Sequence, residues 1–487
     1  MKKTITPWGT PLFFTAISAC FGFYFLFSAH IAVTVTALVL SLFALCFFRV
    51  LASFNERMNA PHITAVCIAA GFVLGLCAAD AGQNKVNFGI PHEKITAIEG
   101  VLLEDPRALA SGTIMASVSL QRSSIQNRQE NARVSSKGVI TVFFPPESSQ
   151  RLREFGRGTR IFAEGALRSN EHGWSFSAVS LHIVKPAPQY ERMRTGIRLN
   201  LLNRFDGKTW GGLALALLVG IRDNLDNNLT AVYRGAGLSY ILALSGMHLA
   251  VITALISFLL KRPLGLKAAS ITGAVIISLY CLLVGPMPSL NRSAIMYLLG
   301  VLALLGSLPK NSMSILSLSF LIQIIITPAA GNSLSFILSY LALLGILITS
   351  RQISSLLGGI IPDIVLQPLS LSCGAFLATA GVCSYFFGMI APVGILAGLV
   401  IVPLTTVFMV GSILWLVLDL FSLSFILSYP LSWIYRLMEL TSSLAGNVPA
   451  IRANPLIVLI LSIVLLLLIA IFEQKRREAL LKLKSFT

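Results

Sequence analysis

Long apolar runs separated by short polar connections make up most of this chain. Three of them lie at about 11–28, 31–48 and 62–79, and a second series follows residue 208. Most are near the length that crosses about 30 Å of hydrocarbon as a helix. The pattern predicts a polytopic α-helical membrane protein with about ten or eleven membrane helices. The second series comprises a short run at about 209–221 and longer runs at about 236–260, 268–285, 291–307, 312–327, 332–350, 364–388, 391–418, 422–440 and 455–472.

Residues 81–188 interrupt this pattern with a polar region that contains no run of membrane length. Short segments in it alternate or are rich in β-forming residues, and turn residues separate them. About five strands in about 100 residues are typical of a small closed barrel, so we predict an OB-like β-domain. A spacer or adhesive domain would show the same periodicity. The predicted strands are Ile95–Leu103, Ile114–Leu120, Gly138–Phe144, Arg160–Leu167 and Trp174–Val184, and polar Ser123–Ser136 is predicted to be a loop.

The region 189–208 combines basic and apolar residues at helical spacing. It predicts a basic amphipathic helix that either lies on the membrane surface or presents a stripe to phosphates. Its basic residues are Arg192, Arg194, Arg198, Arg204 and Lys208. The predicted layout is then membrane helices in 1–80, the β-domain in 81–188, this helix in 189–208, a helical membrane domain in 209–472 and a basic cytoplasmic tail in 473–487.

Composition and charge fit this layout. The chain has 55% hydrophobic and 12% charged residues, and 37 Lys and Arg against 20 Asp and Glu give a net charge of +17. Part of that excess is expected, because cytoplasmic connections of membrane proteins are enriched in Lys and Arg. The basic connections mark the cytoplasmic side and place the β-domain outside the cytoplasmic (inner) membrane. Their basic residues are Lys2, Lys3, Arg49, Arg57, Lys261, Arg262, Lys267, Lys310, Arg351, Lys475, Arg476 and Arg477.

Cysteine and histidine give no metal-site pattern. The seven Cys lie in apolar segments, and the six His include no closely spaced pair. We therefore predict no metal site, no cofactor and no disulfide framework. The sequence also lacks the Gly-rich loop and Lys of a P-loop, so no nucleotide-driven motor is predicted.

Polar residues inside one apolar run provide the first candidate site. The run Gly237–Ile252 carries Ser245, Gly246 and His248 in its middle. Polar groups in hydrocarbon are costly unless they face protein or water, and a glycine allows close approach of backbones. The run either faces a pathway, or holds a His bonded to a neighbouring helix.

Four motifs, in order along the chain, resemble the ComEC-type competence proteins. The first block runs from Ala216 to Leu225 and continues through Tyr233–Leu238 into Leu244–Leu249. The second, Gly285–Ile295, is similar to the family's Pro-Ser-Val-Leu-Arg-Ala-Ala element, and the third, Ser333–Phe336, to its Gln-Leu-Ser-Phe element. The fourth is a series at Phe376–Thr379, Tyr385–Gly388 and Val402–Leu404. The resemblance covers nearly the whole chain.

The resemblance implies an inner-membrane channel that passes single-stranded DNA into the cytoplasm during natural transformation, and not an enzyme. A translocated strand needs a basic, partly aromatic path. Arg292 could instead pair with Asp223 or a backbone carbonyl, or extend to the membrane interface. The candidate pathway residues are Arg222, Asp223, Arg234, Ser245, Gly246, His248, Pro288, Ser289, Arg292 and Ser335, and the candidate DNA contacts of the β-domain are Arg151, Arg153, Arg157, Arg160 and Trp174.

The implied partners are single-stranded DNA, membrane lipid, competence proteins that deliver DNA outside, a helicase or DNA-binding protein inside, and a nuclease in trans. A homo-oligomer is left open. Many family members carry a C-terminal β-lactamase-like domain, which we expect this form to lack. Ser333 and Gly398 stand where the family commonly has Gln and Asn.

Two other classes of function compete with the channel. A secondary transporter or exporter of a small or lipidic solute would use Ser245, His248 and Arg292 as a site at mid-membrane depth. A hydrolase would use Ser245 with His248, but no acidic residue accompanies them to orient the imidazole.

Overall fold

A computed structural model describes residues 11–26, 61–109, 112–127, 130–148, 156–170, 173–308 and 311–484. The chain forms two compact units. The barrel unit comprises Gln83–Leu225 together with Leu282–Gly285, and the helical unit comprises Met1–Gly82, Asp226–Cys281 and Pro286–Thr487. The predicted apolar run at 31–48 lies outside the described residues. So do the basic residues Lys2, Lys3, Arg49, Arg57 and Lys310.

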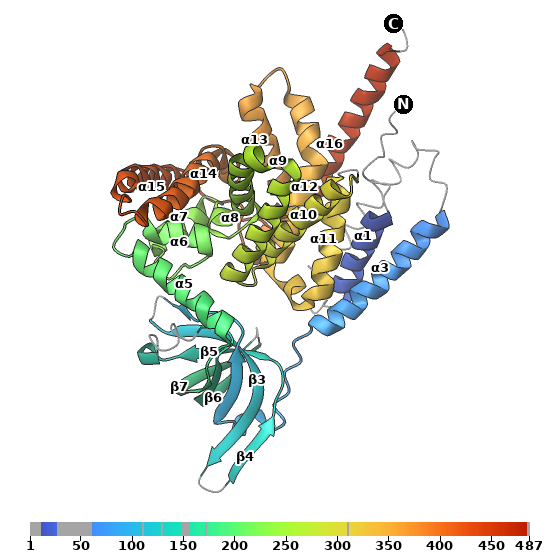
Figure 1. The fold of residues 1–487 in the computed structure, drawn as a ribbon. Coiled ribbons are helices and arrows are strands. Elements are labelled where there is room, and N and C mark those ends of the chain that lie inside the picture. The colour runs from blue at the N-terminus through green and yellow to red at the C-terminus, as the bar shows by residue number, and fades with distance from the viewer. Residues whose placement is uncertain are drawn as a thin grey trace. The chain divides into compact units, whose positions relative to one another are not determined.

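The described residues of the barrel unit contain seven strands in one sheet. β1 pairs with both β3 and β6, so the order β1-β6-β7-β5-β3 closes on itself into a five-stranded barrel. The β5–β7 pair is parallel, and the other pairs are antiparallel. This confirms the predicted OB-like barrel. The strands are β1 (Ala97–Leu102), β2 (Arg107–Ala108), β3 (Ile114–Asn127), β4 (Glu130–Ser135), β5 (Val139–Phe144), β6 (Arg160–Asn170) and β7 (Gly173–Lys185), with short helical turns η2 (His92–Lys94) and η3 (Pro146–Ser148) (Figure 1).

Alternating side chains fill the barrel. Along β5, Ile140, Val142 and Phe144 are buried and their neighbours are half-buried, as the period of two in a strand requires. Phe176 of β7 and Ile98 of β1 join the same apolar core. The apolar residues whose alternation predicted the five barrel strands are therefore those that face the barrel interior.

The predicted loop at Ser123–Ser136 was wrong. β3 continues to Asn127, and β4 pairs with it as a ribbon (Figure 1). Ser123 and Ser136 are buried, and each of their hydroxyls donates to the Phe88 carbonyl, at 2.6 and 2.8 Å. The pairing of backbone groups forms this ribbon without any apolar alternation, which explains why the sequence pattern does not reveal it.

Two helices complete the main elements of the barrel unit, α5 (Gln189–Phe205) and α6 (Gly211–Val219). The predicted helix at 189–208 is confirmed, but its buried face is charged, because Glu191 and Arg194 are both buried. Its apolar residues Tyr190 and Met193 are exposed. Arg194 therefore does not contribute to an exposed phosphate-binding stripe.

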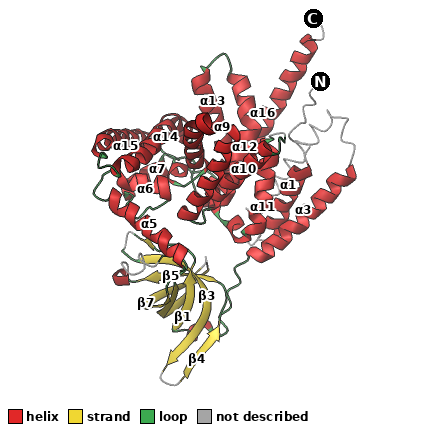
Figure 2. Ribbon diagram, in the orientation of Figure 1, coloured by secondary structure: helices red, strands yellow, loops and turns green. Residues whose placement is uncertain are grey.

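The helical unit contains the remaining helices (Figure 2). The predicted apolar runs within the described residues form helices, except that the run at about 236–260 is divided between α8 and α9. They are α1 (Pro11–Leu26), α3 (Pro61–Gly82), α7 (Asn227–Gly235), α8 (Ser239–Leu242), α9 (Gly246–Val284), α10 (Pro288–Leu305), α11 (Ser312–Ile326), η4 (Pro328–Asn332), α12 (Leu334–Leu357), α13 (Asp363–Phe387), α14 (Val393–Asp419), α15 (Phe425–Gly446) and α16 (Pro455–Lys484). Two predicted runs fall in α9, which Gly265 interrupts with non-helical φ 76°.

Five helices among the described residues are long and apolar enough to cross a membrane: α9, α10, α12, α13 and α14. Shorter apolar helical segments lie in α1, α3, α11 and α16. The predicted class of helical membrane protein with a small barrel is confirmed. The total of ten or eleven crossings stays a prediction.

Close glycine contacts pack α1 against α3. A Cβ on Gly71 would lie 2.3 Å from the Thr15 carbonyl oxygen, and a Cβ on Gly75 would lie 2.1 Å from that of Ala19. The two glycines are four residues apart, so they line one face of α3. This is the small-residue spacing that lets membrane helices approach closely.

Candidate functional site

The candidate pathway residues fall in both units. Arg222 and Asp223 belong to the barrel unit, and the candidates from Arg234 to Ser335 belong to the helical unit. Arg222 and Arg234 are exposed, and Asp223 is half-buried.

The Ser-Gly-x-His motif forms the beginning of a helix. The interpretation of Gly237–Ile252 as one membrane segment was wrong, because α8 ends at Leu242 and α9 begins at Gly246. The backbone N–H of Ser245 donates to Nδ1 of His248 at 3.1 Å, and the Ser245 hydroxyl lies 3.1 Å from the same atom. A side chain of the first turn that accepts from the N-cap backbone resembles half of a capping box. His248 is fully buried. Its unprotonated Nδ1 accepts the hydrogen bond that caps the N-terminus of α9.

Gly246 lies against the side chains of α10. A Cβ on it would be 2.8 Å from Oγ of Ser293 and 2.9 Å from Nη2 of Arg292. Real Cβ atoms do not approach so closely, so a side chain at position 246 would displace the Ser293 hydroxyl and the Arg292 guanidinium from these positions. The structure therefore brings two of the sequence motifs, around Gly246 and Arg292, into contact.

Arg292 is held by neutral groups. Its Nε donates to the Ser339 hydroxyl at 2.7 Å, its Nη2 to the Ser293 hydroxyl at 3.2 Å, and its Nη1 lies 3.5 Å from the Met296 sulfur. The guanidinium also lies over the Tyr340 ring, 5.8 Å from its centroid. Arg292 is 7% exposed, and within the described part of the chain none of its partners is a carboxylate.

A second layer of polar contacts fixes this cluster. The Ser289 and Ser339 hydroxyls are 2.9 Å apart. The Gln323 amide donates to the Pro288 carbonyl at 2.9 Å and accepts from the Tyr340 hydroxyl at 3.0 Å. Pro288 and Ser289 open α10 directly after the non-helical Gly285–Met287 segment, as the prolines predict. The cluster thus joins the starts of α9 and α10 to α11 and α12.

Sequence reasoning missed Ser339, Tyr340 and Gln323. Ser335, which it chose, is exposed, and Ser339 lies one helical turn further along the same helix. The four-residue spacing from Ser335 was the sequence signal that could have pointed to Ser339. Ser333, which stands where the family commonly has Gln, caps α12 and accepts from the Phe336 N–H at 3.2 Å. A glutamine side chain in the cluster comes from α11 instead.

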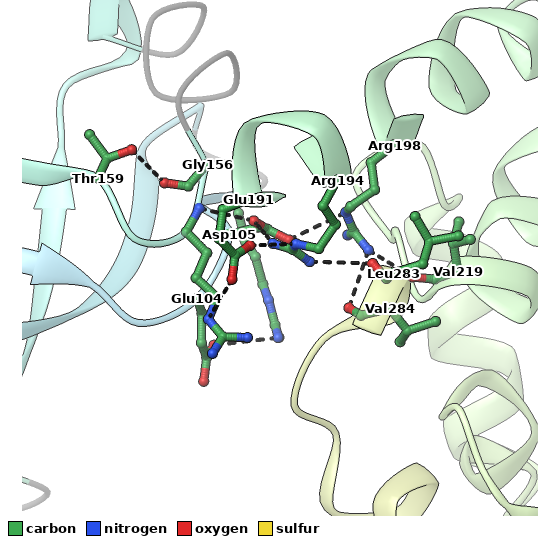
Figure 3. Close-up of polar contacts among 12 residues, drawn as sticks. Glu104, Asp105, Gly156, Thr159, Glu191, Arg194, Arg198, Val219, Leu283 and Val284 are labelled. Carbon is green, nitrogen blue, oxygen red and sulfur yellow. Dashed lines mark hydrogen bonds and ion pairs between the residues drawn. The ribbon is translucent and has the colours of Figure 1, made fainter. Parts of the chain in front are cut away.

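The barrel unit contains a buried ionic network around Asp105, in the connection after β1 (Figure 3). Asp105 accepts from the backbone N–H of Arg157 at 3.1 Å and pairs with Arg194. Nε of Arg198 lies 3.3 Å from its second oxygen. Buried Glu191 pairs with Arg194 at 2.7 Å and with Arg157 at 3.5 Å.

The same arginines also contact helix ends. Arg194 Nη1 donates to the Leu283 carbonyl at 3.4 Å. Arg198 Nη1 donates to the carbonyls of Val219 at 3.1 Å and Val284 at 3.4 Å, which are the last residues of α6 and α9 (Figure 3). Burial lowers the pKa of Arg198, and the negative Asp105 opposes that shift. Asp105 and the two carbonyl-rich helix ends therefore favour the charged guanidinium against the effect of burial.

The candidate DNA contacts of the barrel occupy different environments. Arg157 pairs with Glu191, and Arg160 lies 2.8 Å from Glu99. Trp174 packs edge-on against Phe88 with a centroid distance of 5.1 Å. Arg151 and Arg153 lie outside the described residues. No group of three or more His, Cys, Asp or Glu that could hold a metal ion occurs among the residues described.

A family match covers the part of the chain that runs from α6 into α16. The family described as Competence protein matches residues 217–476, more than half of the sequence. The chain belongs to the competence protein family. The match contains Gly246, Arg292 and Ser339 but not the barrel strands, and the competence protein described here is a multi-pass membrane protein.

Two relatives extend this comparison. ComE operon protein 3 of Bacillus subtilis (strain 168) is 25% identical over 345 residues, which cover 66% of this chain and 42% of that protein. An uncharacterized protein of Aquifex aeolicus (strain VF5) is 26% identical over 274 residues, 56% of this chain and 63% of that protein. The chain thus covers less than two thirds of the length of each.

Proposed function

We propose that this competence-family protein is a channel of the cytoplasmic membrane that passes single-stranded DNA into the cytoplasm during natural transformation. The observation that carries the proposal is the buried guanidinium of Arg292, whose described partners are hydroxyls, a sulfur and an aromatic ring. It lies within the part of the chain that the family match covers.

A buried cation with neutral partners suits a passing polyanion. Two unit charges 4 Å apart attract by about 4 kcal/mol at an effective dielectric constant of 20. A carboxylate partner would oppose this attraction for an incoming phosphate, whereas the Ser339 and Ser293 hydroxyls can rotate to donate to it. The site therefore favours binding of a phosphodiester. None of the described partners of Arg292 is a counterion that a phosphate would first have to displace.

The proposal assigns the entry side to the barrel. The distribution of basic residues among the connections favours a barrel outside the cytoplasm, where competence proteins would deliver DNA to it. A helicase or DNA-binding protein would receive the strand inside, and a nuclease in trans would degrade the complementary strand. The chain itself acts without catalysis in this proposal.

A secondary transporter is the second candidate, because one compact cationic cluster also suits a small anionic solute. It predicts that Arg292 variants lose solute transport while DNA uptake is retained. The channel predicts the reverse.

Replacement of Arg292 tests the proposal. In a host that takes up labelled DNA, Arg292→Gln should reduce internalisation at least about tenfold, equivalent to 1.4 kcal/mol. Arg292→Lys should retain part of the activity, since it keeps the charge but loses the planar fork. Arg436→Gln, at an exposed arginine of α15, is the matched control and should match wild type. Membrane abundance is measured for every variant. Normal uptake by Arg292→Gln at normal abundance would remove this residue from the conducting path.

A further inference from the structure

One guanidinium joins the ends of two helices that are distant in sequence. Arg198 donates to the last carbonyl of α6 and to the last carbonyl of α9, 21 and 86 residues away in the chain. The final carbonyls of a helix have no partner within the helix and need an external donor. Arg194 adds a third donation, to Leu283 beside it.

Both helix ends lead into glycines with left-handed backbone. Gly220 follows α6 with φ 72°, and Gly285 follows α9 with φ 95°. The residues after them are the family motifs that contain Arg222 and Arg292. Arg198 therefore lies where the two motif-bearing segments leave their helices.

Asp105 fixes the direction of this guanidinium. One carboxylate oxygen pairs with Arg194 and the other pairs with Arg198. The backbone N–H of Arg157 donates to the carboxylate and holds it in place. The side chain of Arg198 is only 14% exposed. Little water therefore competes with the carboxylate and the carbonyls for its N–H groups. Lysine could keep the charge, but it would lack the planar fork that faces the carboxylate and both carbonyls together.

We propose that Arg198, oriented by Asp105, is a positioning residue that holds the C-terminal ends of α6 and α9 together, and that DNA passage requires this arrangement. The positional part stands on the contacts alone, and the requirement for passage rests on the proposed function. None of these residues is assigned to contact DNA.

The experiment separates the two parts with a readout that does not involve DNA. Nitroxide labels are placed at Asn224→Cys and Leu282→Cys, both exposed residues of the barrel unit, in a background without native cysteines. Double electron–electron resonance on the purified full-length chain then gives the distribution of distances between them. The variants are Arg198→Ala, Arg198→Lys and Asp105→Asn, and the control is Arg192→Ala, an exposed arginine on the same helix.

We expect a narrow distribution in the parent and in Arg192→Ala, and at least a twofold broadening in Arg198→Ala. Arg198→Lys and Asp105→Asn keep more of the contacts and should broaden it less, which preserves the test if Arg198→Ala is poorly folded. Uptake of labelled DNA per membrane-inserted molecule should fall in the order of the broadening, at least about tenfold for Arg198→Ala.

Unchanged distributions in all three variants would overturn the positioning role. Broadened distributions with normal uptake would overturn the requirement for passage and leave the positional part standing. If Arg292→Gln takes up DNA normally while the Arg198 variants lose both order and uptake, then the assigned path fails and the positioning role survives.

Discussion

Gly246 and Arg292 show how one missing side chain shapes the cluster. The guanidinium occupies space that any Cβ at position 246 would enter. Position 246 is also the first residue of α9, where the unpaired backbone N–H groups of a helix favour an anion. The residue is therefore constrained by its neighbour across the helix interface and not by its own backbone.

Gly246→Ala should separate stability from function. Alanine in place of glycine in a helix is favourable by about 0.5–1 kcal/mol where there is room, but here it displaces the guanidinium. We expect uptake to fall about tenfold while the thermal midpoint changes little. Gly300→Ala in α10, where a Cβ would meet nothing within 4 Å, should leave uptake unchanged. Equal uptake by both variants would show that the close approach has no functional role.

His248 gives the second prediction at this scale. Since its Nδ1 accepts from the Ser245 N–H, His248→Gln can replace that acceptor and should keep near-normal uptake. His248→Ala loses the cap, which costs about 0.5–2 kcal/mol, and should lower membrane abundance and uptake in proportion. Immunoblots of membranes and DNA internalisation check both variants. Loss of uptake in the Gln variant at full abundance would instead indicate a role for proton exchange at the imidazole.

At the scale of elements, the α1–α3 pair depends on two glycines of one helical face. Gly75→Leu places a branched side chain where even a Cβ would be 2.1 Å from the Ala19 carbonyl oxygen. Overpacking of this kind costs about 1–3 kcal/mol, so the helix pair should separate and the protein should be degraded. Val73→Leu, at a position that is 57% exposed on the same helix, is the control. Wild-type levels of the Gly75 variant in membranes would contradict the packing described here.

The elements also show how much of the structure the sequence pattern can predict. Apolar alternation revealed the five barrel strands, because their inward faces form one core. The sequence pattern did not predict the β3–β4 ribbon, because buried hydroxyls such as that of Ser123 take the place of apolar side chains. Arg292 was found as a charged residue in an apolar segment. Its partner Ser339 is 47 residues away on another helix, and no local period reveals such a contact.

At the scale of the whole molecule, the barrel has a predicted orientation across the membrane. We predict that it is extracytoplasmic, from the charges of the connections. Val179→Cys in β7, at an 81% exposed position, should react with an impermeant thiol reagent in intact spheroplasts of a strain that carries otherwise Cys-free protein. Ser123 would be a poor choice, since it is buried. Reaction only after lysis would invert the topology and remove the barrel from the entry side.

The barrel unit is built from two pieces of chain, and this has a consequence for biosynthesis. Its last piece, Leu282–Gly285, is translated long after α5. Ribosomes add about 5–20 residues per second, so the 86 residues between Arg198 and Val284 require about 4–17 s. During that interval α9 must be made before its carbonyls can reach the arginines. The contacts of Arg194 and Arg198 with the end of α9 can therefore form only once the first part of the helical domain has been synthesised, which makes the order of translation part of the barrel unit's assembly.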